Sequence, residues 1–251
     1  MMNKYLIIAG AFLMQLGIFS CTEKNKKETT TTVETLTNPE EVAETSDSTV
    51  ESQKNPADFV PKGYVIFDTI YGDLNKDGAE DCAIVIKGTD KSKVIKDDYR
   101  GQLDRNRRGI IVLFNKNNSY ELAVKNYDCF SSENEDGGVY FAPELSVEIK
   151  NNKLHIHYGH GRYGYWEYTF RFQNSDFELI GYDSSSNRGP VVETEVSINF
   201  LTRKKITNEN TNKEDEGGDE VFEKTETKIS KSKLTKLSEI KDFDGFEVSE
   251  E

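Results

Sequence analysis

The chain has 251 residues and a formal net charge of −13 at pH 7. Such an excess of acidic side chains repels nucleic-acid phosphates, so nucleic acid is excluded as a partner. The same acidity either concentrates divalent cations or simply keeps the protein soluble, and the net charge alone does not separate these two roles.

The N-terminus is organised as an export signal. Lys4 gives one positive charge, and residues 5–19 follow without a charged side chain, as in the first two regions of a signal peptide. A transmembrane helix needs about 20 apolar residues, so this run is too short to span a bilayer comfortably. We therefore expect residues 1–20 to be a signal peptide that is removed.

The residues around the expected cleavage point resemble the lipobox of bacterial lipoproteins. Ile18 stands three residues and Ser20 one residue before Cys21, as an aliphatic and a small residue do in that motif. The resemblance implies that Cys21 carries palmitate or a similar lipid, which anchors the protein to the cell envelope, at the periplasmic face or the cell surface, without spanning the membrane. Phe19 is bulkier than the usual residue at its position, so cleavage without lipidation is the alternative.

Residues 21–57 are predicted to be a lipidated, disordered tether. After Cys21 this segment is dominated by Thr, Glu, Ser, Lys and Asn and contains no aromatic residue. It therefore buries too little apolar surface to offset the entropy lost on ordering. A β-rich domain is expected at residues 58–248. Its cysteines, Cys82 and Cys129, either pair in an oxidising compartment or remain two separate buried thiols.

The β-rich domain is predicted from short alternating apolar runs separated by Gly, Asn and Asp, with little helical periodicity. Eight candidate strands form two runs of four, each an antiparallel meander resembling a propeller blade, and a further hairpin follows at 191–206 and 220–229. We expect an all-β fold, sandwich-like or like a partial propeller. Residues 88–108 are predicted to be a long basic loop. The candidate strands are 64–70, 82–87, 109–115, 120–127, 145–150, 154–158, 165–172 and 177–182.

A loop between two predicted strands has the spacing of a calcium site. Calcium takes six to eight oxygen ligands, which alternate residues of a tightly wound loop can supply. Gly78 permits the sharp bend, and Ile84 stands where an EF-hand would place a glutamate, so the loop is not an EF-hand. We expect a structural Ca²⁺ here, and a metal-free turn of the same shape is the alternative. The expected ligands are Asp73, Asn75, Asp77, the carbonyl of Ala79, and Asp81.

This loop and the strand after it, residues 72–86, resemble the FG-GAP and VCBS repeats that form blades of extracellular β-propellers. The resemblance implies calcium ligands at Asp73, Asn75, Asp77 and Asp81. The motif does not recur, so a complete propeller is not supported. Residues 64–206 are also similar to uncharacterised bacterial lipoproteins that share the loop and a later His-Tyr-Gly segment, which implies export and no particular activity.

All three histidines lie within a short stretch near the middle of the chain. His155 and His157 are two residues apart, so on a strand both point to one face. Such a pair suits zinc or another transition metal, with His160 or Glu167 as a third ligand. A metal-dependent enzyme using these residues is therefore one possibility. The other is that the histidines occupy the solvent face of a half-buried sheet.

The stretch that follows alternates glycines with large side chains, namely Arg162, Tyr163, Tyr165 and Trp166. Exposed aromatic rings with polar neighbours can stack on sugars, which makes this a candidate ligand-binding segment, and an aromatic loop at the core edge is the alternative. No catalytic residue is predicted, because nucleophile-elbow and phosphate-loop patterns are missing from the sequence. We favour a binding or envelope-interaction lipoprotein, with a glycan or an envelope protein as partner.

Overall fold

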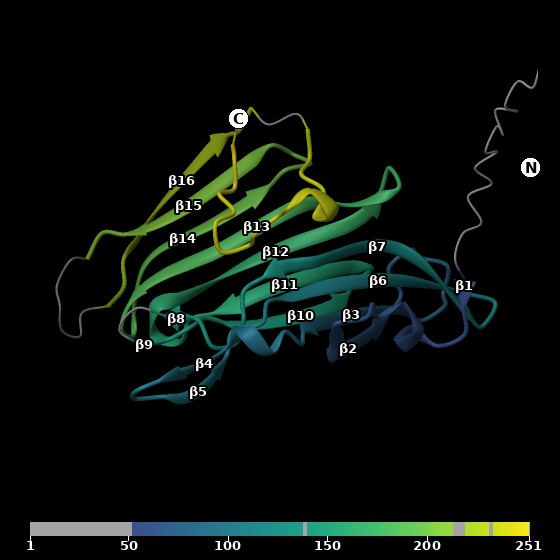
Figure 1. The fold of residues 1–251 in the computed structure, drawn as a ribbon. Coiled ribbons are helices and arrows are strands. Elements are labelled where there is room, and N and C mark those ends of the chain that lie inside the picture. The colour runs from purple at the N-terminus through teal and green to yellow at the C-terminus, as the bar shows by residue number, and fades with distance from the viewer. Residues whose placement is uncertain (1–51, 138–139, 213–218, 231–232, 251) are drawn as a thin grey trace, which may run out of the picture. The chain divides into compact units, whose positions relative to one another are not determined.

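The structure is a computed structural model, and it describes residues 52–137, 140–212, 219–230 and 233–250 (Figure 1). The chain divides into two units, Met1–Asp47 and Ser48–Glu251, and every described residue belongs to the second. The predicted signal peptide, Cys21 and most of the predicted tether lie outside the described residues. Within the described ranges, no helix is long and apolar enough to cross a membrane.

The second unit is all-β with antiparallel sheets, as the alternating pattern predicted. One sheet has the strand order β1-β7-β6-β3-β2, so the four long strands follow one another as the first predicted meander. The short strand β1 pairs with β7 at Ser52↔Glu121. Pairing thus begins inside the range predicted as a tether, because a neighbouring strand edge accepts even a polar segment. The strands are β1 (Ser52–Gln53), β2 (Tyr64–Gly72), β3 (Asp81–Gly88), β6 (Arg108–Lys116) and β7 (Ser119–Phe130).

The other sheet has seven strands in chain order, from β10 to β16. Its first four strands are the second predicted meander. The predicted first hairpin arm, 191–206, is wrong as one strand, because a turn at Arg203, with φ 57°, divides it into β14 and β15. The strands are β10 (Glu144–Lys150), β11 (Lys153–Gly159), β12 (Gly164–Gln173), β13 (Asp176–Arg188), β14 (Val191–Asn199), β15 (Lys204–Asn210) and β16 (Phe222–Lys228).

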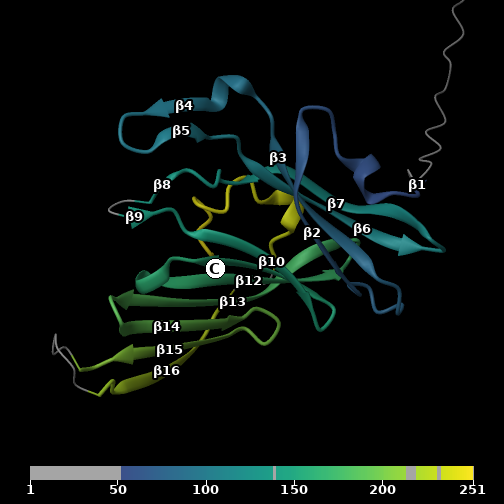
Figure 2. The ribbon, with the colours of Figure 1, turned by 90° about the horizontal axis from the view of Figure 1, so that it is seen from below.

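The predicted basic loop at 88–108 contains a small hairpin, which stands apart from both sheets in Figure 2. Its turn is closed by Asp97, whose carboxylate accepts the backbone N–H groups of Tyr99 and Arg100. The hairpin is β4 (Val94–Asp97) and β5 (Gly101–Asp104), and a second small pair is β8 (Asp136–Gly137) and β9 (Tyr140–Phe141). The 3-10 turns are η1 (Pro56–Phe59), η2 (Lys91–Lys93), η3 (Gly161–Tyr163) and η4 (Leu237–Glu239).

The main core lies between the two sheets. Phe114 of β6 meets Phe172 of β12 edge-on, with ring centroids 4.6 Å apart. The C-terminal segment, yellow in Figure 1, closes this core, since Phe243 is 1 % exposed and its ring lies 5.1 Å from the ring of Tyr168. Burial of several such aromatic rings is the main stabilising contribution available to this domain.

Strand β3 is buried on both faces, which explains why residues 82–86 are an unbroken apolar run. Cys82 belongs to a second cluster on the face away from the main core, where Phe59 and Tyr64 cover it. Cys129 belongs to the main core instead. Both cysteines are free and buried, so the alternative of two separate thiols holds and the disulfide does not form.

Candidate ligand-binding site

The β2–β3 loop is wound by its own side-chain oxygens. Asp73 accepts the backbone N–H groups of Lys76 at 2.6 Å and Gly78 at 3.2 Å. Asn75 accepts that of Asp77 at 2.9 Å, and Asp77 accepts that of Ala79 at 2.7 Å. Gly78 has φ 83°, which only glycine adopts without strain. The alternating pattern therefore builds the tight loop that the sequence predicted.

The last predicted ligand, Asp81, is fully buried and ties this loop to the sheet. One carboxylate oxygen accepts the N–H of Leu74 at 2.8 Å, and the other accepts that of Asn115 at 3.0 Å. Burial raises the pKa of Asp81, because it outweighs the opposing effect of these two hydrogen bonds. Through these two hydrogen bonds, Asp81 fastens the loop to the end of β6.

The donor chemistry of the loop suits Ca²⁺, since carboxylate and amide oxygens are its preferred ligands. In the structure, however, the side-chain oxygens of Asp73, Asn75 and Asp77 accept hydrogen bonds from backbone N–H groups of the loop. No group of three or more His, Cys, Asp or Glu side chains is placed to hold a metal ion within the part of the chain that the structure describes. Calcium binding would therefore require Asp73 and Asp77 to exchange some of these hydrogen bonds for the ion.

His155 and His157 point to the same face of the seven-stranded sheet, as their spacing predicted. Glu167 lies between them: His155 Nδ1 is 2.8 Å from Oε1 and His157 Nδ1 is 3.4 Å from Oε2. His160 instead caps the η3 turn, where its ring lies 5.2 Å from that of Tyr163. Because Glu167 hydrogen-bonds to His155 and lies within ion-pair distance of His157, the arrangement differs from three ligands converging on one ion.

A cavity of about 320 Å³ lies beside the η3 turn. Glycines make the turn possible: Gly161 has φ 53°, and Gly164 has φ 107° and lies so close to Ser185 that a Cβ would be 1.8 Å from its carbonyl oxygen. The cavity is thus formed by a turn that larger residues could not make. Its lining residues are Ala142, Glu144, Gly159, His160, Gly161, Arg162 and Tyr163.

Two of the four predicted ligand-binding residues, Arg162 and Tyr163, therefore line this cavity. Tyr165 lies on the histidine face instead, 38 % exposed, with its ring stacked 5.4 Å from that of His157. Trp166 stacks on Tyr158 with centroids 5.4 Å apart and packs against the main core. The strand alternation separates these side chains, which a count of aromatic residues along the sequence does not reveal.

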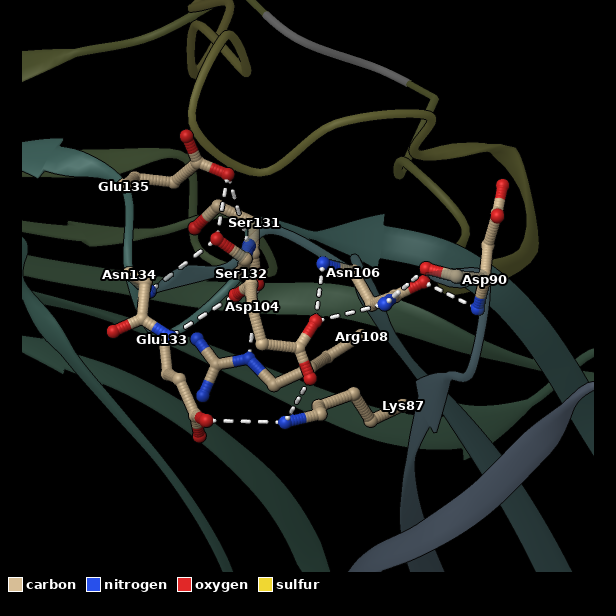
Figure 3. Close-up of polar contacts among 10 residues, drawn as sticks. All are labelled: Lys87, Asp90, Asp104, Asn106, Arg108, Ser131, Ser132, Glu133, Asn134 and Glu135. Atoms are coloured by element: carbon tan, nitrogen blue, oxygen red, sulfur yellow. Dashed lines mark hydrogen bonds and ion pairs between the residues drawn. The ribbon is translucent and has the colours of Figure 1, made fainter. Parts of the chain in front are cut away.

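A second polar region was not predicted from the sequence and lies where the long basic segment returns to the sheet (Figure 3). Lys87 forms ion pairs with Asp104 at 2.8 Å and Glu133 at 3.1 Å. Burial disfavours the Asp104 carboxylate, but hydrogen bonds from Lys87 and Asn106 prevail and lower its pKa to about 2. These ion pairs leave no signal in the sequence, because Lys87 is distant along the chain from both Asp104 and Glu133.

No model of a protein family, no curated protein and no solved structure matches this chain. Its function is therefore inferred from its own residues.

Proposed function

We propose that this chain is an exported, lipid-anchored protein of the bacterial cell envelope, whose β domain binds a glycan and performs no catalysis. Residues 1–20 and Cys21 support export and anchoring through their resemblance to lipoprotein signals. The membrane is then a partner through the lipid alone, and the folded domain is free to engage a second partner.

The cavity beside η3 is the observation that carries the binding proposal. Tyr163, 37 % exposed, presents a ring that suits the C–H face of a sugar. Arg162 and Glu144 line the same cavity and bring hydrogen-bonding groups of opposite charge. A volume of about 320 Å³ is at the lower end of small-molecule sites, so a short glycan segment suits it better than a large ligand.

Binding of the full-length chain to a panel of envelope-type glycans, followed by saturation-transfer NMR, tests this proposal. Tyr163→Ala should abolish saturation transfer, while Tyr163→Phe should keep most of it because the ring is retained. Tyr99→Ala is the matched control, since Tyr99 is 99 % exposed in the β4–β5 turn. Equal binding by the Tyr163→Ala and Tyr99→Ala variants, or no binding by the wild type, would contradict the proposal.

We also propose that Ca²⁺ binds the β2–β3 loop and stabilises the domain. The oxygen donors of Asp73, Asn75, Asp77 and Asp81 and the tight winding of the loop support this, and metal that binds only the folded state adds to stability. Calorimetry with millimolar CaCl₂ and terbium luminescence are the measurements. The absence of both signals would leave the loop as a metal-free turn.

The alternative is a transition-metal-dependent enzyme using His155, His157, His160 and Glu167. It has less support, because Glu167 bridges two imidazoles and His160 lines the cavity instead. Elemental analysis distinguishes the two proposals: stoichiometric zinc, iron or copper that is lost in His157→Ala would favour the enzyme.

A further inference from the structure

Arg108, the first residue of β6, is a buried cation with few partners. Arg108 is 3 % exposed, and its Nε donates a hydrogen bond to the carbonyl of Ser131 at 2.9 Å. Among the described residues, its two terminal nitrogens, Nη1 and Nη2, donate no hydrogen bond. Figure 3 shows the guanidinium with a dashed line from Nε alone. A guanidinium carries five N–H donors, so most of them are available.

The neighbouring basic residues differ from Arg108 in this respect. Arg107 bonds Asp242 at 2.8 Å, and Lys87 bonds both Asp104 and Glu133. The Glu133 carboxylate is joined to Lys87, and not to Arg108, by the dashed line in Figure 3. Burying an arginine that has no carboxylate in hydrogen-bonding contact is costly, and burial lowers the pKa of Arg108 against the opposing effect of Tyr158 and Glu133. An arrangement of this kind calls for an external anion or for solvent at the guanidinium.

The aromatic ring of Phe67 packs over the Arg108 guanidinium. The Phe67 ring centroid lies 5.2 Å from Cζ of Arg108 and 5.8 Å from Nζ of Lys87. Phe67 is 42 % exposed, and it sits where the pairing of β2 with β3 shifts register between Ile66 and Asp68. A half-exposed ring at a bulge can turn aside at low cost, because few atoms hold it from the solvent side.

We propose that Arg108 binds an oxyanion, a carboxylate or phosphate group of a ligand that enters beside Phe67. The planar guanidinium presents two terminal nitrogens in the fork that pairs with two oxygens of such a group, which an ammonium cannot reproduce. The site lies on the five-stranded sheet and shares no lining residue with the η3 cavity. It is therefore independent of the proposed glycan site.

Thermal unfolding of the full-length chain in phosphate, acetate or chloride, at constant ionic strength, tests this proposal. Saturable stabilisation by phosphate or acetate is expected, with a rise in melting temperature of about 5 to 10 °C at 100 times the dissociation constant. Which of the two anions saturates first identifies the class of oxyanion. Arg108→Lys should weaken binding at least roughly 10-fold, because charge remains but the fork is lost.

Arg107→Lys is the matched control, since its guanidinium is already hydrogen-bonded to Asp242, and it should bind the anion like the wild type. Tyr163→Ala should also leave anion binding unchanged, which separates this proposal from the glycan site. If the Arg108 variant does not fold, the NMR signals of the Arg108 guanidinium in the wild type should shift on adding phosphate. A melting temperature that follows ionic strength equally in all variants, or unshifted signals, would mean that water alone solvates Arg108.

Discussion

Replacing Asp81 by asparagine should destabilise the domain by about 1 to 3 kcal/mol. The carboxylate is fully buried and accepts two backbone N–H groups, from Leu74 and Asn115. Asparagine keeps one acceptor oxygen but turns an NH₂ group toward the other N–H donor, so one buried donor loses its partner. Alanine would remove both acceptors and should cost about 2 to 6 kcal/mol, since each of the two buried N–H groups left without a partner costs roughly 1 to 3 kcal/mol.

The stability cost of Asp81→Asn should depend on pH. The pKa of Asp81 is raised by burial, so the folded state binds its proton more tightly than the unfolded state does. The contribution of Asp81 to stability is then full below the unfolded pKa of about 4 and falls as the pH rises through the folded value. The cost of Asp81→Asn should therefore be larger at pH 3 than at pH 7.

Urea denaturation followed by the fluorescence of Trp166, the single tryptophan, measures this difference with a calcium chelator present. Asp98→Asn is the control, because Asp98 is exposed in the β4–β5 turn. An Asp81→Asn variant within about 0.5 kcal/mol of the wild type would refute the structural role. A cost that grows with pH would mean that the two hydrogen bonds, and not burial, dominate the titration of Asp81.

Three further predictions concern the anchor, the cavity turn and the metal loop. Cys21→Ala should abolish palmitate labelling and release the protein from the membrane fraction, and continued labelling would exclude lipidation at that residue. Gly164→Ala should destabilise by more than about 2 kcal/mol, because its Cβ would lie 1.8 Å from the carbonyl of Ser185, whereas Gly189→Ala, with positive φ but open space, should cost only about 1 kcal/mol by urea titration. Asp77→Ala should lower the melting temperature more in calcium than in chelator, and an equal loss in both would argue against bound metal.

The fold could be predicted because the strands alternate apolar and polar residues along their length. Strand β11 is the clearest case, since Leu154, Ile156 and Tyr158 are buried while His155 and His157 face outward. The turn after β14 was missed because it contains neither Gly nor Pro. Arg203 adopts a positive φ there, and the Asn199 side chain closes the turn by accepting two backbone N–H groups.

The C-terminal segment and the polar region around Arg108 illustrate what the sequence did not reveal. Leu237, Ile240 and Phe243 enter the main core without strand or helix periodicity, so only tertiary packing identifies them. Arg108 is the last residue of the predicted basic loop, yet it is buried. For the η3 cavity, Arg162 and Tyr163 were predicted, but Glu144 was not, because it comes from the neighbouring strand β10.

The β10–β11 hairpin contacts both the proposed calcium loop and the proposed glycan cavity beside η3. At its turn, the Asn152 side chain donates a hydrogen bond to the carbonyl of Asp73 in the metal loop, at 2.9 Å. At its other end, Glu144 and Gly159 line the cavity. Gly72, just before the loop, lies so close to β10 that a Cβ would be 2.5 Å from Ile149 Cγ2. The start of the loop therefore packs directly against β10.

Calcium should therefore stabilise the domain without changing ligand affinity at the cavity. Seven residues of extended strand separate the two ends by roughly 20 Å, and a paired antiparallel hairpin has no second packing arrangement to transmit a change. Glycan affinity measured with calcium and with chelator, below the melting temperature in both, should agree within about 2-fold. A difference of 10-fold, which corresponds to a coupling of about 1.4 kcal/mol, would show that the hairpin moves as a unit when the loop takes up the ion.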